Sequence, residues 1–135
     1  MTEIKFWKDD KKEKIEPSLF SEQAEKLAKK LAEDNKSSKG RKENKRTQIR
    51  KFYDEVLRLD MEAKNPERKW DDILPFVHML VAKTAYAKGR ELVSDDFFKF
   101  IELSVKQISE PKDLSVFANF FEALMGFYRL HGPAN

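Results

Sequence analysis

The sequence has 135 residues, enough for one domain with a single hydrophobic core. Charged residues make up 38% of it and apolar residues 40%, and it contains only four glycines and five prolines. A β-sandwich or β-barrel needs more turn residues, so the composition favours helices. There is no cysteine, which excludes disulfides, thiolate metal sites and a cysteine nucleophile. No apolar run approaches the ~18 residues of a membrane span, and the polar first residues are no signal peptide, so we expect a cytoplasmic protein.

Positive charge is concentrated in the first part of the chain. Residues 1–51 carry 16 basic and 10 acidic side chains, whereas residues 52–135 carry 11 basic and 14 acidic ones. From Lys36 to Lys51 there are eight basic residues and a single acid. Such an excess creates a positive potential, as expected of a surface that binds nucleic acid or an acidic partner. The alternative is a flexible, solvated segment that only aids solubility, and composition does not decide between the two.

The first half of the chain predicts two helices after a polar segment. Residues 1–16 mix both signs of charge with little apolar periodicity, so we expect them to be disordered, with Phe6 and Trp7 as exceptions that could dock on a neighbour. A first helix begins near Pro17 and fades by Asp34 into a flexible polar linker. A second helix begins around Asn44 to Thr47, either of which can cap it, and ends at the Asn65–Pro66 step.

The second half predicts three more helices. One runs from Asp71 to Lys88, with Gly89 as its C-cap. Ser94 caps the next helix, and Pro111 breaks it. The last helix opens at Asp113 and closes at Gly132–Pro133. The fourth of the five helices is expected to point Phe97, Phe98, Ile101, Val105 and Ile108 inward. The sequence therefore predicts an all-α fold, a single-domain bundle of about five helices over residues 17–135 that follows a mobile charged N-terminus.

The residues that usually carry catalysis or bind metals form no recognisable site. His78 and His131 belong to no HExxH or other ligand-spaced cluster, and a packed or surface role is the simpler interpretation of each. Asp71–Asp72 and Asp95–Asp96 are adjacent pairs that do not converge, and both open helices whose dipoles favour anions. There is no glycine-rich phosphate loop. We therefore expect no enzyme activity, no cofactor and no metal.

The polar faces of two predicted helices carry cations at helical spacing. Arg46 and Arg50 lie one turn apart on the second helix, and the third helix carries two cations and a tyrosine at positions i, i+3 and i+7. Lysine and arginine bind phosphates, and tyrosine stacks on bases or donates a hydrogen bond. The alternative is an ordinary solvated helix face with ion pairs to nearby acids. The candidate contacts to nucleic acid are Lys45, Arg46, Arg50, Lys51, Lys83, Tyr86, Lys88, Arg90 and Arg129.

Three stretches together resemble a known family. Asn44–Tyr53 contains the run Thr47-Gln48-Ile49-Arg50, Ala85–Arg90 the pattern A-Y-x-x-G-R, and Phe120–Tyr128 the pattern E-A-L-x-[AG]-[FY]. In this order and spacing they resemble the small subunit of type III-A CRISPR–Cas effector complexes, the Csm-complex small subunit. The resemblance covers Asn44 to Pro133, and the first 40 residues carry no such motif.

The resemblance implies a non-catalytic, RNA-binding structural subunit of an antiviral ribonucleoprotein. Several copies of such subunits line the inside of a filament and contact the backbone of the guide–target RNA duplex, which helps to hold the target strand. Cutting of target RNA belongs to a neighbouring subunit. Because base pairing reads the sequence, a basic surface suited to the backbone is sufficient. The implied partners are guide RNA, target RNA, the other subunits and further copies of the chain, with no membrane.

Two other functions fit the residues alone. A helical adaptor would use the same basic face to bind an acidic partner protein, without direct RNA contact. A helix-turn-helix DNA binder would use the turn at Gly89, but the segment Ser94–Ile108 that follows opens acidic and then turns phenylalanine-rich, so it makes a poor recognition helix.

Overall fold

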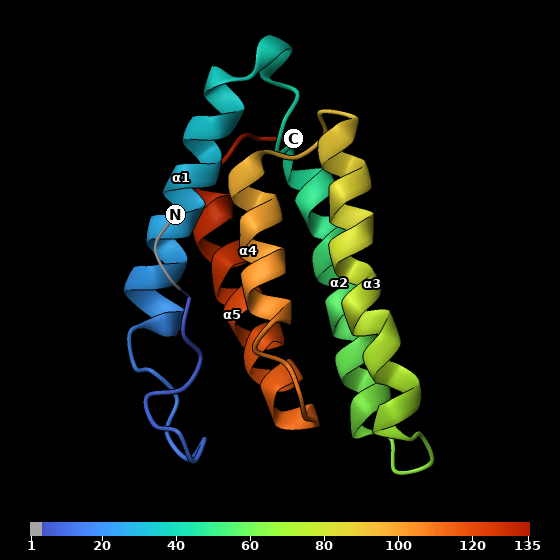
Figure 1. Ribbon diagram of the computed structural model, residues 1–135. Helices are drawn as coiled ribbons and strands as arrows, with labels where there is room; N and C mark the ends of the chain where they lie inside the picture. The colour runs from blue at the N-terminus through green and yellow to red at the C-terminus, as the bar shows by residue number, and fades with distance from the viewer. Residues whose placement is uncertain (1–3) are drawn as a thin grey trace.

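A computed structural model describes residues 4–135, which form five α-helices and no β-strand, so the predicted all-α bundle is confirmed (Figure 1). A π-helical turn at Leu19–Gln23 leads into the first helix, and a 3₁₀ turn at Lys39–Arg41 precedes the second. No helix in this part of the chain is long and apolar enough to cross a membrane. The five helices are α1 (Ala24–Ser37), α2 (Arg46–Lys64), α3 (Trp70–Gly89), α4 (Asp95–Val105) and α5 (Pro111–His131).

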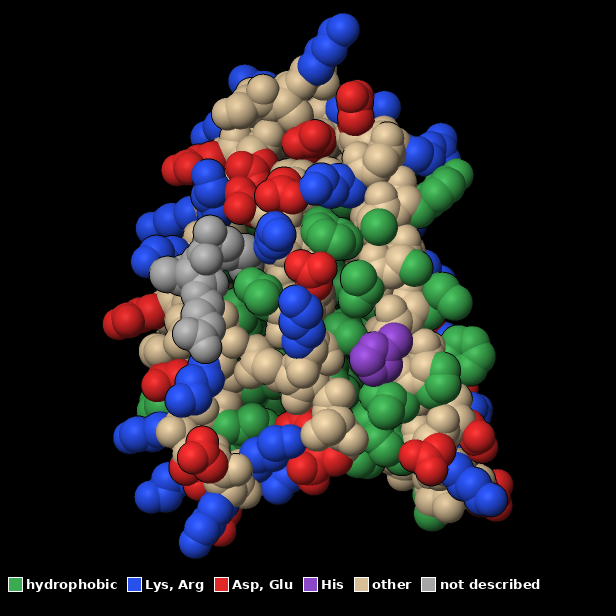
Figure 2. All heavy atoms as spheres, in the orientation of Figure 1, with side chains coloured by type: hydrophobic (Ala, Val, Ile, Leu, Met, Phe, Trp, Pro, Cys, Tyr) green, Lys and Arg blue, Asp and Glu red, His purple; other side chains and the backbone are tan. Residues whose placement is uncertain are grey.

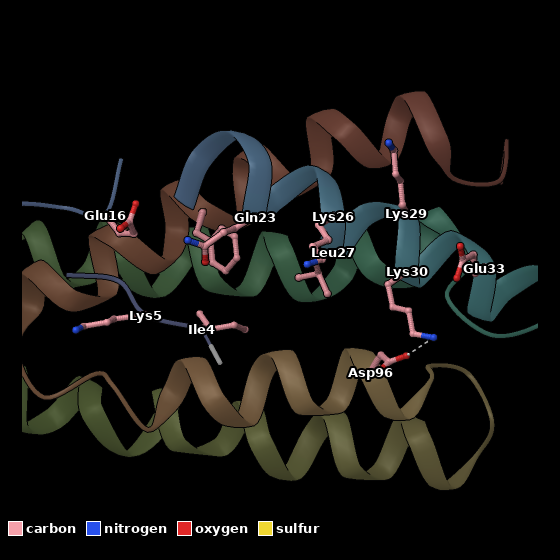
Figure 3. Close-up of a pocket in the computed structure, with 11 residues that line it drawn as sticks. Ile4, Lys5, Glu16, Gln23, Lys26, Leu27, Lys29, Lys30, Glu33 and Asp96 are labelled. Carbon is pink, nitrogen blue, oxygen red and sulfur yellow. Dashed lines mark ion pairs between the residues drawn. The ribbon is translucent and has the colours of Figure 1, made fainter. Parts of the chain in front are cut away.

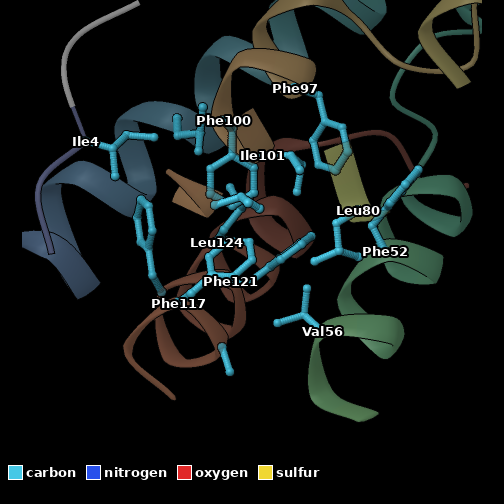
Figure 4. Close-up of a cluster of buried hydrophobic side chains, with 14 of the residues drawn as sticks. Ile4, Phe52, Val56, Leu80, Phe97, Phe100, Ile101, Phe117, Phe121 and Leu124 are labelled. Atoms are coloured by element: carbon cyan, nitrogen blue, oxygen red, sulfur yellow. The ribbon is translucent and has the colours of Figure 1, made fainter. Parts of the chain in front are cut away.

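Helix α5 is the centre of the bundle. It packs against α1 on one side and α2 on the other, while α3 packs against α2 and α4 (Figure 1). Phenylalanines from α4 and α5 interlock at ring-centroid distances of 5.2 to 5.9 Å, as between Phe100 and Phe121 or Phe117 and Phe121 (Figure 4). Such tilted aromatic pairs add stability beyond the area that they bury. Phe98, expected inside, is only half-buried, whereas Phe100 is fully buried.

Residues 4–16 pack against the bundle, in contrast to the expected disorder of residues 1–16. Phe6 is fully buried and stacks on Phe117 at 6.2 Å. The Trp7 indole N–H and the Lys12 ammonium both donate to the Asp113 carboxylate, each at 2.8 Å. The charged Lys12 of this segment forms ion pairs at the start of α5, and local periodicity does not reveal such distant partners. The folded unit therefore includes residues before the expected boundary at 17; residues 1–3 lie outside the described part.

Asp113 is the fully buried acid that fixes this segment. Burial alone would raise the pKa of its carboxyl, but the Lys12 ammonium and the N–H groups of Ser109, Trp7 and Glu110 hold that pKa below its usual value. Asp113 also completes a capping box with Glu110, the N-cap of α5. The expected opening of the last helix at Asp113 is thus close, but the helix begins two residues earlier, at Pro111.

Asn44 fixes the start of α2. Its side chain is completely buried and its backbone has a φ of 59°, in the left-handed region that asparagine tolerates better than most residues. Its side-chain amide donates to the Ser94 hydroxyl at 2.8 Å and accepts from the Ser94 N–H at 2.9 Å. The Tyr128 hydroxyl donates to its carbonyl at 2.6 Å. Asn44 therefore joins α2 to the α4 cap and to α5, and the prediction that Asn44 or Thr47 caps α2 is wrong, because Lys45 is the N-cap.

Two other predicted boundaries differ in the structure. The linker after Asp34 is partly ordered, because the buried Asn35 amide donates to the carbonyls of Arg41 and Glu43 at 2.9 and 2.8 Å. Gly89 is not a C-cap: it is the last residue of α3, and the left-handed residue that turns the chain is Glu91, with a φ of 61°.

One surface of α3 stays apolar. Phe76, Met79 and Tyr86 are 54%, 46% and 67% exposed. Figure 2 shows hydrophobic side chains at the surface along α3, on the right of the view, while charged side chains of both signs dominate the side formed by α1. The basic candidates at the end of α3 thus follow directly on an apolar stretch.

Candidate nucleic-acid interface

Three of the predicted arginines meet in a groove between α2 and α5. Arg46, Arg50 and Tyr53 are spaced at i, i+4 and i+7 on α2, so they share one face. Arg129 projects from α5 into the same space. The groove has a volume of about 480 Å³. Its full lining is Arg46, Thr47, Arg50 and Tyr53 from α2, and Glu122, Met125, Gly126 and Arg129 from α5.

Gly126 leaves room in this groove. A Cβ atom placed on Gly126 would meet nothing within 4 Å, so the glycine is not required by any close contact. Glycine inside a helix is about 0.5–1 kcal/mol less favourable than alanine. The sequence thus forgoes stability at a position where a longer side chain would project into the space between the arginines.

The groove is electrically unbalanced. Three guanidinium groups line it together with a single carboxylate, Glu122. Arg50 approaches Asp54 at 3.4 Å, but both side chains are more than half exposed, and pairs of that kind contribute little. The Arg50 guanidinium also lies 5.8 Å from the centre of the Tyr53 ring. Burial raises the pKa of Tyr53, and the nearby Glu122 carboxylate raises it further.

The donors at the start of α2 already hold oxygen atoms of the chain itself. The Arg46 guanidinium donates to the carbonyl of Ala134, and the Thr47 N–H and hydroxyl both donate to the Asn135 oxygen, at 3.1 and 3.2 Å. Arg46, Thr47 and the positive end of the helix dipole thus converge on acceptor oxygens. Lys45 lies beside them, in a cavity of about 510 Å³ that it shares with His131 and the residues that follow it.

The candidates on α3 lie outside the groove lining, and the structure gives each cation a neighbour. Lys83 reaches Glu55 of α2 at 3.7 Å, and Lys88 pairs with Asp95 of α4 at 2.6 Å. The guanidinium of Arg90, the residue that follows α3, lies 5.7 Å from the centre of the exposed Tyr86 ring. On α2, Lys51 is exposed but does not line the groove. The structure therefore brings together Arg46, Arg50 and Arg129, and sets the other candidates around or away from them.

Another cavity lies between the N-terminal segment, α1 and α4 (Figure 3). It has a volume of about 690 Å³ and an apolar floor that includes Leu27 and Phe120. Its rim carries four lysines and three acids, and Lys30 bridges to Asp96 at 3.7 Å. Charges of both signs are therefore nearly balanced there, unlike those of the arginine groove.

Within residues 4–135 no group of three or more His, Asp or Glu side chains is placed to hold a metal ion. His78 is exposed on α3. His131 approaches Glu25 of α1 at 2.8 Å, and this contact lowers the pKa of the Glu25 carboxyl. Both histidines thus have ordinary surface or packing surroundings.

Sequence reasoning missed the residues that make the groove more than a helix stripe. Tyr53, Glu122 and Gly126 were recognised only as parts of motifs. The spacing of Glu122, Met125, Gly126 and Arg129 on α5, at i, i+3, i+4 and i+7, is the signal for a shared face. What the spacing does not give is the partner helix that this face meets.

A small helical bundle with an arginine-lined groove between two helices is the class of protein that this geometry defines. The model of the family Csm2 Type III-A matches residues 14–134. The chain therefore belongs to the Csm2 family and is a small, structural subunit of a type III-A CRISPR complex, with the other subunits of that complex as partners.

A relative from Streptococcus thermophilus agrees with this assignment. It is described as "CRISPR system Cms protein Csm2" and is 27% identical over 115 residues, which cover 84% of this chain and 91% of the relative. No solved structure gives a significant match. The match to the family extends the resemblance seen in the motifs from residue 44 back to residue 14, and so includes α1.

Proposed function

We propose that this subunit holds RNA without catalysis, through phosphate contacts made in the groove between α2 and α5. The observation that carries the proposal is the convergence of Arg46, Arg50 and Arg129 on one groove with a single opposing acid. Guanidinium groups bind phosphate oxygens in bidentate fashion and stay charged at any physiological pH. In the assembled complex the RNA is the guide–target duplex, and several copies of the chain add weak contacts along it.

In this proposal the remaining candidates lie outside the groove and contribute less to RNA binding. Lys45 and Lys51 extend the positive potential along α2. The residues of the α3 end, which are Lys83, Tyr86, Lys88 and Arg90, contribute only where RNA displaces their present neighbours. Sequence-independent backbone contacts suit a complex in which base pairing selects the target.

The test replaces Arg50 by glutamate. Losing one charge-assisted phosphate contact and adding repulsion lowers RNA affinity by about tenfold, and reduces the slope of log affinity against log salt by about one. Both are measured by fluorescence anisotropy with an RNA duplex, for the free chain and for the assembled complex. Lys69→Glu is the matched control, because the substitution changes the charge equally. Lys69 is the exposed N-cap of α3, beyond the end of α2 that lies away from Arg46.

Association with the partner subunits separates this function from the adaptor alternative. We expect Arg50→Glu to co-purify with the other subunits as wild type does, while binding RNA weakly. If the variant instead loses its partner subunits and retains RNA affinity, the groove is a protein-binding surface and the proposal is wrong.

A further inference from the structure

Glu122 is the one acid among the residues that line the arginine groove. It projects from α5, is exposed, and makes no salt bridge or side-chain hydrogen bond with any residue of the described chain 4–135. Arg50 is paired with Asp54, and Arg46 with the carbonyl of Ala134. Glu122 therefore pairs with none of the three arginines, although it lines the same groove.

A carboxylate in a phosphate-binding groove has an electrostatic cost. It repels each phosphate that the arginines attract, because all four side chains line one groove. An ionised carboxylate can only accept hydrogen bonds, and phosphate oxygens have nothing to donate. A bound backbone must therefore offer Glu122 a donor, or leave it facing like charges.

The ribose 2′-hydroxyl is the donor that an RNA backbone places beside every phosphate, and DNA lacks it. Resting on the function proposed above, we propose that Glu122 accepts a hydrogen bond from a ribose 2′-hydroxyl while the arginines hold the adjoining phosphates. Glu122 thereby makes the groove selective for RNA over DNA. For DNA the carboxylate contributes only repulsion, so the selectivity arises chiefly by penalising the wrong backbone.

The experiment measures the affinity of the full chain for duplexes of one sequence made of RNA or of DNA, at one salt concentration. Glu122→Ala removes charge and acceptor together, so DNA affinity rises and the RNA-to-DNA affinity ratio falls by roughly three- to tenfold, the value of one hydrogen bond. Glu122→Gln keeps a neutral acceptor, and its ratio falls between those of Glu122→Ala and wild type. Glu67→Ala is the matched control: the same charge is lost from the exposed turn between α2 and α3, and the ratio stays unchanged.

A third duplex separates hydrogen bonding from shape. RNA with 2′-fluoro riboses keeps the A-form geometry of RNA but has no hydroxyl to donate. Wild-type protein should bind it less tightly than RNA, and Glu122→Ala should bind the two equally. An unchanged RNA-to-DNA ratio in Glu122→Ala, or equal wild-type binding of fluoro-substituted and natural RNA, overturns the inference.

Failure of this inference is distinct from failure of the proposed function. If Arg50→Glu weakens RNA binding while Glu122→Ala leaves the ratio unchanged, the groove binds RNA and only the role of Glu122 is wrong. If Arg50→Glu leaves RNA binding unchanged, the groove itself is not the RNA site. Glu122 is exposed on a helix, and circular dichroism of both variants checks that they are folded.

Discussion

The groove between α2 and α5 and the C-terminal half of α3 look alike in sequence and differ in structure. Both carry cations at helical spacing. In the groove, a second helix contributes Arg129 opposite Arg46 and Arg50. At α3, the neighbouring helices contribute acids instead, so that Lys83 meets Glu55 and Lys88 meets Asp95. The proposed difference in RNA binding between the two regions therefore depends on what the helix packed beside each stripe contributes, an arginine at the groove and acids at α3.

The largest expected effect comes from two triple variants, each of which neutralises the three cations of one region. Replacing Arg46, Arg50 and Arg129 by glutamine should lower RNA affinity by about 100-fold and reduce the salt slope by about two, because each lost phosphate contact removes about 0.7–0.9 from the slope. Replacing Lys83, Lys88 and Arg90 by glutamine should lower affinity by less than about fivefold, since these cations lie outside the groove and add only to the surrounding positive potential. Salt titrations of both variants measure this, and equal losses would abolish the distinction between the regions.

A pH titration should separate the groove from the contact between α1 and the start of α4. Burial and the adjacent Asp96 carboxylate raise the pKa of Asp34 to about 6, from a usual value of 3.8, although Lys30 lies 3.7 Å from both acids. The folded state thus binds this proton more tightly than the unfolded state. The contribution of Asp34 to the free energy of unfolding should therefore fall by about 1–2 kcal/mol as pH rises from about 4 to about 6, so the stability of the wild type relative to Asp34→Asn should fall by that amount over this range.

Urea titrations at several pH values measure this stability change. Arginine does not titrate in this range, so RNA affinity should stay constant between pH 6 and 8 at fixed salt. If the stability of the wild type relative to Asp34→Asn instead rises between pH 4 and 6, the direction assigned to Asp34 is wrong.

Glycine offers a smaller and cleaner comparison. Gly126 in the groove and Gly89 at the end of α3 are both helical, and an added Cβ meets nothing within 4 Å at either position. Gly126→Met should raise the free energy of unfolding by about 0.5–1 kcal/mol through helix propensity, yet weaken RNA binding several-fold because the side chain fills the groove. Gly89→Met should leave RNA affinity unchanged. Thermal unfolding and anisotropy measured on the same samples test both, and undiminished RNA binding by Gly126→Met would place the RNA elsewhere.

The smallest effect is expected from a substitution that removes the ion-pair partner of Lys88. Asp95→Asn removes the acid that holds Lys88 at 2.6 Å. RNA affinity should rise by up to about threefold, as one surface ion pair is worth at most about 1 kcal/mol. A fall in affinity would show that the pair itself orients Lys88 for binding.

Much of the fold could be predicted from residues whose signals are local. Ser94 accepts a hydrogen bond from the Phe97 N–H as a helix cap should, and the apolar spacing located all five helices. The docking of Phe6 and Trp7 was allowed for by their apolar character, but the partners of these residues and of Lys12 lie on α5 and could not be predicted from the sequence. Asn44 likewise looks like a helix cap, and only the tertiary structure shows that it is a buried, left-handed junction.

The candidate site was predictable in part. The spacing of Arg46 and Arg50 on one helix defines half of the groove, and Arg129 on the last helix was also among the predicted contacts. That α5 packs beside α2 is a property of topology, which no motif contains. For the same reason, the ion pairs of Lys83 and Lys88 could not be foreseen: their acids lie on other helices.

The docking of residues 4–16 on α5 has a consequence for synthesis. Trp7 leaves the ribosome 106 residues before Asp113, its hydrogen-bond partner, and Phe6 stacks on a ring that emerges later still. These aromatic side chains have no native surface to cover them until nearly the whole chain has been made. Contacts between residues so distant in sequence form late and slow the closure of a fold. The bundle thus becomes complete only when its last helix arrives, so an interrupted chain lacks both the central helix of the core and the arginine that completes the groove.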